Sequence, residues 1–285
     1  MAGHLHFAAP SALDYFTTLV AEDMGFPLFE AAVTLAQDDD PQLDVQGVLA
    51  RVDDLAERLR RRTPADSTPL QRLRLLNRYL FQELGFAGNV NDFFDPRNSF
   101  LPAVLESRRG IPISLAVLYI EIASHNGLKA QGVSFPGHFL VKVQLPSGDV
   151  VIDPFSGHAV SREALEERLA PFRQATAARS GSDEVPLGLY LQPATARETL
   201  ARMLRNLKEI HRSRCDWPRL ERVQARLVVL LPQAWEEHRN HALVLAQMGR
   251  HSAAADALAP YLQHCPDASD AESLHRHLAA WLRVS

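Results

Sequence analysis

The chain has 285 residues, of which 46% are hydrophobic and 22% charged, an ordinary composition for a globular protein of one or two domains. Its net charge of -4 at pH 7 excludes the basic excess typical of nucleic-acid-binding domains, so we expect no nucleic-acid partner. No stretch approaches the roughly 18 apolar residues that a membrane-spanning helix needs, so we expect no membrane partner either.

The first residues, Met1–Phe7, lack a basic segment followed by an apolar one, which predicts no secretory signal. The two cysteines, Cys215 and Cys265, lie far apart and match no metal or redox spacing. Free thiols suit a reducing compartment, and we therefore expect a cytoplasmic protein.

Apolar residues recur at helical spacing from residue 12 to residue 62, with one well-defined helix predicted near Val45–Arg62. Proline and aspartate at 38–41 and proline at 64 and 69 interrupt this pattern. Another helix is predicted from about Leu70 to Leu84. Residues 1–85 are therefore expected to form an N-terminal helical region.

The segment 85–109 is rich in Asn, Asp, Phe and Pro, which predicts an ordered loop with a short helix at Pro102–Ser107. Pro112 is suited to the first position of the next helix, because its missing N–H has no intrahelical partner there. That helix is expected to end near His125, since Asn126 and Gly127 form a common C-terminal signal.

The periodicity then changes to that of strands, which are predicted at Gln131–Ser134, Phe139–Leu145 and Val150–Asp153. Residues 146–149 form the predicted hairpin turn between the last two strands. We expect residues 86–190 to form an α+β core with a small antiparallel sheet packed on the Pro112 helix.

From residue 191 to 285 the pattern is helical and repetitive. The pairs Leu231-Pro232 and Cys265-Pro266 are separated by the 34-residue tetratricopeptide period. Small and apolar residues occupy the expected repeat positions, at Ala242, Leu245, Gly249, Ala254, Leu258 and Tyr261. A last helix with Leu274, Leu278, Ala279 and Leu282 as its apolar stripe is expected to cap the stack.

The central motifs resemble those of the bacterial SirB family. The resemblance is carried by Asp95-Pro96-Arg97-Asn98-Ser99-Phe100-Leu101, Arg109-Gly110-Ile111-Pro112-Ile113, Phe135-Pro136-Gly137-His138-Phe139-Leu140, Asp153-Pro154-Phe155 and Arg202-Met203-Leu204-Arg205-Asn206-Leu207-Lys208. It implies a transglutaminase-like, papain-related core with helical flanks and a C-terminal tetratricopeptide region, but no settled activity. Related regions occur in some eukaryotic F-box proteins, which favours a role in protein handling.

Transglutaminase-like hydrolases place a cysteine after Gly-x at a helix start, followed by a histidine and an aspartate. In this chain Gly110-Ile111-Pro112 matches the Gly-x-Cys position, and His138 and Asp153 match the remaining pair. Proline carries no thiol or hydroxyl. The sequence therefore predicts a catalytic layout without its nucleophile.

Ser114 is the substitute to consider, but two helical residues turn its side chain by about 200° from the Pro112 direction. Ser114 is either a first-turn residue that binds free N–H groups or a serine nucleophile. His138 and Asp153 are either a buried structural pair or part of a ligand or relic site.

A polar cluster comprises Asp95, Arg97, Asn98, Glu106, Arg108 and Arg109. It either locks an irregular loop or grips a peptide or carboxylate-bearing ligand, with Arg97 suited to a bidentate pair. Arg202, Arg205, Asn206 and Lys208 lie on adjacent turns of one helix and are expected to contact this cluster or to line a groove.

No histidine, cysteine or carboxylate set has metal-ligand spacing, and no phosphate-binding loop occurs, so we expect no metal and no cofactor. The leading hypothesis is a non-catalytic protein- or peptide-binding or regulatory module. The alternative is a hydrolase or acyl-transferase that uses Ser114, His138 and Asp153. A third hypothesis is a structural subunit whose polar cluster only stabilises the fold.

Overall fold

The computed structural model describes residues 10–22, 25–180 and 185–284, so the prediction for Met1–Phe7 lies outside the described residues. The chain divides into two compact units. We call Pro27–Ala36 with Leu43–Met203 the core unit, and Met1–Phe26, Gln37–Gln42 and Leu204–Ser285 the helical unit. None of the described helices is long and apolar enough to cross a membrane.

The core unit contains most of the secondary structure between residues 27 and 203. Its helices are α2 (Leu28–Val33), α3 (Val45–Arg62), α4 (Pro69–Asn77), α5 (Leu101–Ser107), α6 (Pro112–His125), α7 (Arg162–Ser180) and α8 (Leu187–Tyr190). Its strands are β1 (Ala87–Gly88), β2 (Arg109–Gly110), β3 (Lys129–Val133), β4 (Leu140–Leu145), β5 (Gly148–Asp153) and β6 (His158–Ala159). The 3₁₀ segment η3 (Pro96–Ser99) and a π-helical turn, η2 (Arg78–Glu83), complete it. The 3₁₀ segment η1 (Thr34–Asp38) begins in the core unit, and its last two residues belong to the helical unit.

Several helices begin where the sequence provides a cap. Asp44 accepts a hydrogen bond from the Gly47 amide at the start of α3, and Thr68 and Gln71 form a reciprocal capping box at α4. Pro112 is the first residue of α6, as predicted, and Gly127 ends that helix with a φ of 71°. The helix predicted at 70–84 is α-helical only to Asn77 and continues as the π-helical η2.

The main sheet has the strand order β3-β4-β5-β6, and all neighbouring strands are antiparallel. The hairpin register pairs Leu145 with Gly148 and Val141 with Ile152. The three predicted strands are present, with bounds shifted by one or two residues. A separate parallel pair joins β1 to β2. The two-residue strands β1, β2 and β6 are too short to give a periodic signal.

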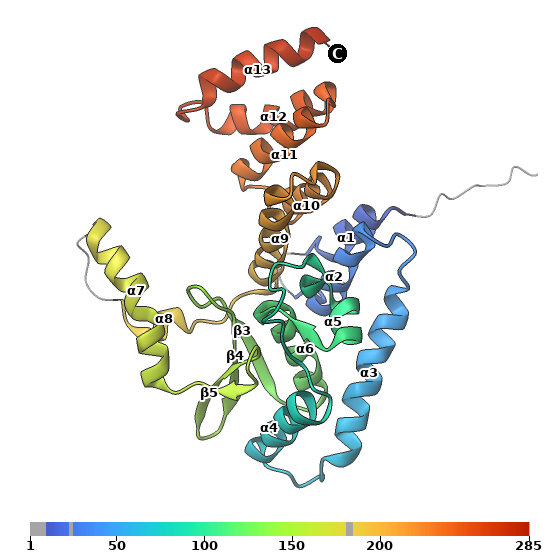
Figure 1. Ribbon diagram of the computed structural model, residues 1–285, viewed down its shortest axis with the longest axis vertical. Helices are drawn as coiled ribbons and strands as arrows, with labels where there is room; N and C mark the ends of the chain where they lie inside the picture. Colours follow the sequence, from blue (N-terminus) through green and yellow to red (C-terminus); the bar gives the residue numbers. More distant parts are fainter. Residues whose placement is uncertain (1–9, 23–24, 181–184, 285) are drawn as a thin grey trace, which may run out of the picture. The chain divides into compact units, whose positions relative to one another are not determined.

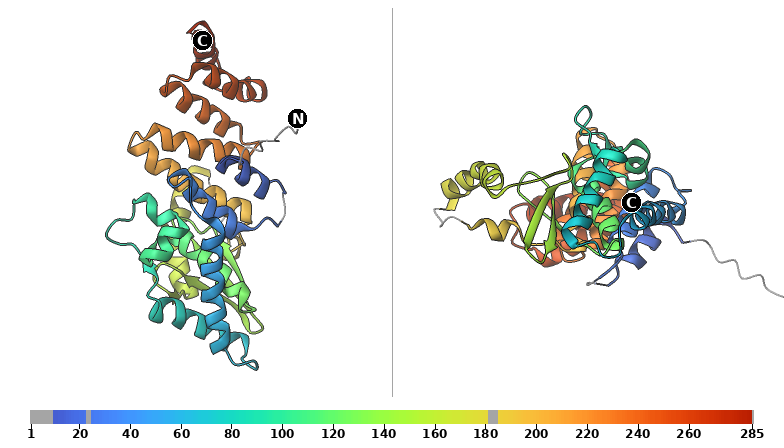
Figure 2. Two further views of the ribbon diagram at one scale, coloured as in Figure 1. Left: turned by 90° about the vertical axis from the view of Figure 1, so that its right-hand side faces the viewer. Right: turned by 90° about the horizontal axis from the view of Figure 1, so that it is seen from below.

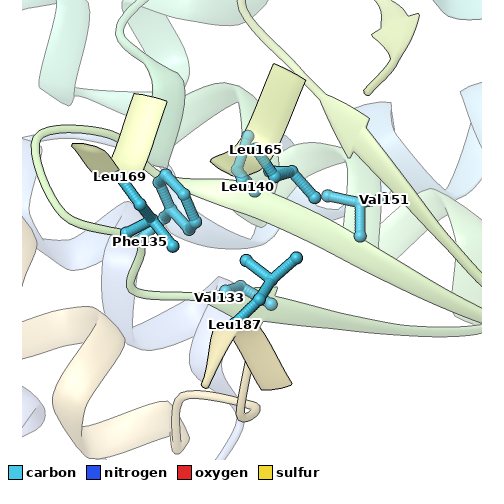
Figure 3. Packing of buried hydrophobic residues seen from close by; sticks show 7 residues of the cluster. All are labelled: Val133, Phe135, Leu140, Val151, Leu165, Leu169 and Leu187. Carbon is cyan, nitrogen blue, oxygen red and sulfur yellow. The ribbon is translucent and has the colours of Figure 1, made fainter. Parts of the chain in front are cut away.

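Helices cover both faces of this sheet (Figure 1). Alternate residues of each strand point to opposite faces. On one face, α6 packs against β3 and β4. On the other, α7 and α8 contribute to a buried cluster shown in Figure 3, made of Val133, Phe135, Leu140, Val151, Leu165, Leu169 and Leu187. The expected α+β core is therefore present, with a helix layer on each side of the sheet.

The helical unit contains α1 (Ala12–Leu19), the end of α9 (Ala196–Ser213), α10 (Trp217–Leu230), α11 (Trp235–Gln247), α12 (His251–His264) and α13 (Ala271–Val284). Helices α10 to α13 pack successively on one another (Figure 2), as a tetratricopeptide stack requires. Ala242 and Leu258 are fully buried in it, as the repeat pattern predicts.

The N-terminal segment of the helical unit is held on α10 by arginines. Arg226, which is 1% exposed, binds both carboxylate oxygens of Asp38 at 2.9 and 2.8 Å and lies over the ring of Phe16. Arg219 binds Asp39 at 2.6 Å, and Arg222 donates to the Asp38 carbonyl. A buried ion pair of this kind fixes the position of a segment, since removing either partner would leave an uncompensated charge.

The apolar stripe predicted for the last helix is wrong at its end. Leu274 is buried and Leu278 packs on the same cluster, but Ala279 is exposed and Leu282 is 62% exposed. Trp281 occupies the stripe instead. At about 100° per residue, a residue seven positions after Leu274 returns to almost the same face, whereas one eight positions later is turned away by about 80°.

Candidate functional site

His138 and Asp153 meet at one end of the sheet. His138 lies in the turn before β4, and Asp153 is the last residue of β5, so the antiparallel pairing of these strands brings the two side chains together. His138 Nε2 lies 2.8 Å from Asp153 Oδ1. This bond leaves Nδ1 of the imidazole without a hydrogen-bond partner among the described residues.

Asp153 is a buried carboxylate with every oxygen in use. Its Oδ1 also accepts from the Phe155 amide at 3.0 Å, and its Oδ2 accepts from Arg168 Nη1 at 3.1 Å. Burial by itself raises the pKa of Asp153, but the bonds from His138, Phe155 and Arg168 outweigh that effect and leave the pKa below its ordinary value. The group is therefore an ionised anchor that orients the imidazole.

Arg168, on α7, is part of the site, although no sequence motif pointed to it. Together with His138, Asp153, Pro136, Gly137 and Phe172 it lines a cavity of about 300 Å³. The side chain of His138 is 23% exposed and that of Arg168 is 42% exposed. The pocket is therefore open to solvent, with donors at its rim and Asp153 at its base.

Arg202, on α9, holds the turn that carries His138. Its guanidinium donates to the His138 carbonyl at 2.9 Å, to the Phe135 carbonyl at 3.3 Å and to Ser134 Oγ at 2.7 Å. It also lies 5.6 Å from the ring centroid of Phe139. We expected Arg202 to contact the polar cluster or a groove, but these bonds make it a positioning residue for the turn.

Aromatic rings adjoin the other side of His138. The ring of Phe155 meets the imidazole edge-on, with 6.4 Å between the ring centroids. Phe155 in turn packs at a tilt against the ring of Phe93, with 6.1 Å between the centroids. Phe155 also lies directly on the backbone of Gly88, where a Cβ atom would come within 2.2 Å of the ring. Phe93 and Phe94 are 43% and 71% exposed, so an apolar loop borders the site.

The helix start that would carry a nucleophile is closed. Pro112 and Ser114 are both buried, and Ser114 is 0% exposed. Ser114 Oγ donates to the Asn98 carbonyl at 2.6 Å and accepts from the Ile111 amide at 3.1 Å. The hydroxyl thus satisfies backbone groups at the start of α6, and the described contacts of Ser114 do not include His138.

The predicted polar cluster contains two kinds of residue. Asp95 caps η3 by accepting from the Arg97 amide, and the buried Asn98 donates to the carbonyls of Asp92 and Phe93. These two side chains lock the loop. Arg97 and Glu106 are exposed, and no hydrogen bond or ion pair of either side chain with another described residue is present.

Arg108 and Arg109 donate to the carbonyls of Leu84 and Gly85, so they tie α5 to the preceding segment. Arg205 lies 3.4 Å from Glu237 within the helical unit, and Lys208 binds the same carboxylate at 2.6 Å. Asn206 is half-buried on the same helix. The contacts of Arg205 and Lys208 are therefore with the helical stack.

Within residues 10–22, 25–180 and 185–284, no three His, Cys, Asp or Glu side chains lie close enough together to hold a metal ion. What the site offers chemically is an oriented imidazole, a fixed carboxylate and a partly free guanidinium around one small pocket.

Comparison with known proteins agrees with the two halves of the chain. A model of the transglutaminase-like superfamily matches residues 46–205, and a tetratricopeptide repeat model matches residues 207–279. A UPF0162 protein of Xylella fastidiosa is 38% identical over 258 residues, which cover 90% of each chain. A UPF0162 protein of Pseudomonas aeruginosa is 29% identical over 78% of each chain.

A shorter match involves a eukaryotic protein. F-box only protein 21 of Mus musculus is 39% identical over 72 residues, which are 25% of this chain and 12% of that protein. The family assignment comes from the longer matches: the chain belongs to the transglutaminase-like superfamily, among the bacterial UPF0162 proteins with a C-terminal tetratricopeptide region.

Proposed function

We propose that this protein is a non-catalytic protein-binding or regulatory module whose His138–Asp153 pocket recognises a partner. The proposal rests on the first turn of helix α6, where an exposed nucleophile would have to lie. Pro112 has no nucleophilic atom, and the hydroxyl of Ser114 is fully buried and bonded to backbone groups. A nucleophile must reach both its base and its substrate, and a sealed hydroxyl reaches neither.

The pocket suits a polar side chain from a peptide. Arg168 uses one nitrogen on Asp153 and keeps further N–H groups toward solvent, and Nδ1 of His138 faces no described partner. Carboxylate and carboxamide groups pair well with such donors. The exposed Phe93 and Phe94 provide an apolar surface for the neighbouring residues of the same peptide.

A protein partner fits the rest of the chain. Tetratricopeptide stacks present surfaces that commonly bind peptides. We further propose that the protein belongs to the SirB family and that its chain divides into regions 1–85, 86–190 and 191–285. We also propose a cytoplasmic location, which agrees with the free thiols of Cys215 and Cys265.

The test is in-cell photo-crosslinking of the full-length protein through a photoreactive residue in place of Phe94, which is exposed and packs on Phe93. The proteins that crosslink to the wild-type protein are compared with those that crosslink to His138→Ala and to Arg168→Ala. His158→Ala is the matched control, because His158 is an exposed histidine on the adjacent strand β6. We expect both pocket variants to lose a partner that the control keeps.

An identical bound set for the wild type and both pocket variants would contradict the proposal. The second candidate, a hydrolase or acyl-transferase using Ser114, His138 and Asp153, shares the oriented imidazole. It requires α6 to open, and it predicts covalent labelling of Ser114 by a fluorophosphonate that His138→Ala abolishes.

A further inference from the structure

A groove lies on the helical unit, formed by one stripe from each of three successive helices. Lys208 and Arg212 come from α9, Trp217, Leu220 and Gln224 from α10, and Asn240, Leu243 and Gln247 from α11. The spacings within each stripe are three, four or seven residues, which place the members on one helix face. The groove encloses about 450 Å³, within the range of ligand sites.

Gln224 is the unusual residue of this groove. It is 0% exposed, and its Nε2 donates to the Glu237 carbonyl at 2.9 Å and to Glu237 Oε2 at 2.7 Å. These bonds fix the orientation of the amide. Its Oε1 has no hydrogen-bond partner within the part of the chain that the structure describes. A buried acceptor left unpaired is costly, so this atom is suited to a donor from a ligand.

Two further carboxamides, Asn240 and Gln247, line the same groove from α11. A carboxamide offers both a donor and an acceptor, which is the pairing that a peptide bond requires. Leu220, Leu243 and Val244 supply the apolar wall between them, and Leu243 is 37% exposed. Three carboxamides around an apolar wall match an extended peptide better than a compact charged ligand.

The charge of the groove selects among peptides. Lys208 binds Glu237 at 2.6 Å and Arg212 binds Glu209 at 2.6 Å, while Arg205 also contacts Glu237. Among the residues that line the groove, Lys208 and Arg212 are positive and Glu209 is negative, so this end of the groove has a net positive charge. An acidic residue beside the apolar anchor complements it.

We propose that the α9–α11 groove binds an extended segment of a partner protein in which an apolar side chain lies next to a carboxylate. The peptide backbone donates an N–H to Gln224 Oε1 and pairs with Asn240 and Gln247. The apolar side chain packs between Leu220 and Leu243, and the carboxylate lies toward Lys208 and Arg212. This proposal shares with the proposed function only the premise that the partner is a protein.

The experiment uses full-length protein and fluorescein-labelled short peptides with a central leucine flanked by glutamate, by lysine or by serine. Fluorescence polarisation should show the tightest binding for the glutamate-flanked peptide. Leu243→Ser and Asn240→Ala should each weaken that binding by about tenfold, the usual loss for an interface anchor. Leu282→Ser is the matched control, an exposed leucine of the same unit outside the groove, and it should bind as the wild type does.

Equal affinity for the three peptides, or equal affinity of Leu243→Ser and wild type, would overturn the proposal. Self-association of the peptide-free protein that Leu243→Ser abolishes would assign the groove to a second copy and would also overturn it. The proposed function can fail separately from this proposal. If peptides bind in the groove and His138→Ala crosslinks to the same proteins as the wild type, only the proposal for the His138–Asp153 pocket is contradicted. Loss of a partner in His138→Ala without peptide binding contradicts only the groove.

Discussion

By their sequence pattern, the start of α6 and the end of β5 match the two halves of a thiol-hydrolase site, and in this protein the two segments differ in their access to solvent. At α6, Ser114 is 0% exposed and its hydroxyl is bonded to the backbone. At β5, Asp153 orients His138, whose side chain is 23% exposed beside an open pocket. The helix start that matches the nucleophile half is part of the core, while the side chain of His138 faces solvent.

This difference shows which part of the layout the fold itself needs. Asp153 is 4% exposed and binds a histidine, an arginine and a backbone amide, so its loss would leave several groups unpaired. Pro112 needs only a helix start. The start of α6 therefore forms without a thiol, whereas the His138–Asp153 pair is held in place by several contacts.

The largest effect is expected for Asp153→Asn. The amide cannot accept from His138, Phe155 and Arg168 as the carboxylate does, and we expect the core unit to lose about 3 kcal/mol of unfolding free energy. All three tryptophans, Trp217, Trp235 and Trp281, lie in the helical unit. Hydrogen exchange of β4 and β5 amides should therefore report the loss, while tryptophan fluorescence should not.

Asp149→Asn is the matched control, because Asp149 is on the same strand with its side chain 48% exposed. Comparable destabilisation by both substitutions would show that Asp153 has no special place in the fold.

Gly88→Ala is expected to cost about 2 kcal/mol, because the new methyl group would overlap the ring of Phe155. The ring would have to move, and it contacts His138. We therefore also expect a shift in the imidazole NMR signals of His138. Gly188→Ala, where no atom lies within 4 Å of the added Cβ, should change neither quantity.

Ser114→Ala is expected to cost about 1 kcal/mol, the usual effect of losing a side chain that satisfies the first turn of a helix. Partner capture should be unchanged, because Ser114 has no exposed surface. Loss of capture together with native hydrogen exchange would indicate that this serine acts on a ligand.

The smallest effect depends on pH. The pKa of Asp153 in the folded protein lies below its ordinary value of about 3.9. Its contribution to stability is therefore complete above that ordinary value and is lost as the pH falls through the folded pKa. The difference in unfolding free energy between wild type and Asp153→Asn should shrink between about pH 5 and pH 2 in urea titrations. A constant difference over that range would contradict the assignment.

Much of the fold could be predicted from local signals. Caps, proline and hydrophobic period gave the bounds of α3 and α6 and the β4–β5 hairpin, and the 34-residue period predicted the helical stack. Arg168 could not be found in this way, and Arg202 was predicted to contact the polar cluster or a groove rather than the turn of His138. Each belongs to a helix that comes after Asp153 in the chain, and only the tertiary packing brings them to His138 and Asp153.

The proposed function requires that no nucleophile serves the His138–Asp153 pair. To test this, the folded full-length protein is exposed to a fluorophosphonate and an iodoacetamide probe, and the labels are located by peptide mass spectrometry. We expect no label on Ser114 and thiol labels only on Cys215 and Cys265, unchanged in His138→Ala. A fluorophosphonate adduct on Ser114 that disappears in His138→Ala would contradict it.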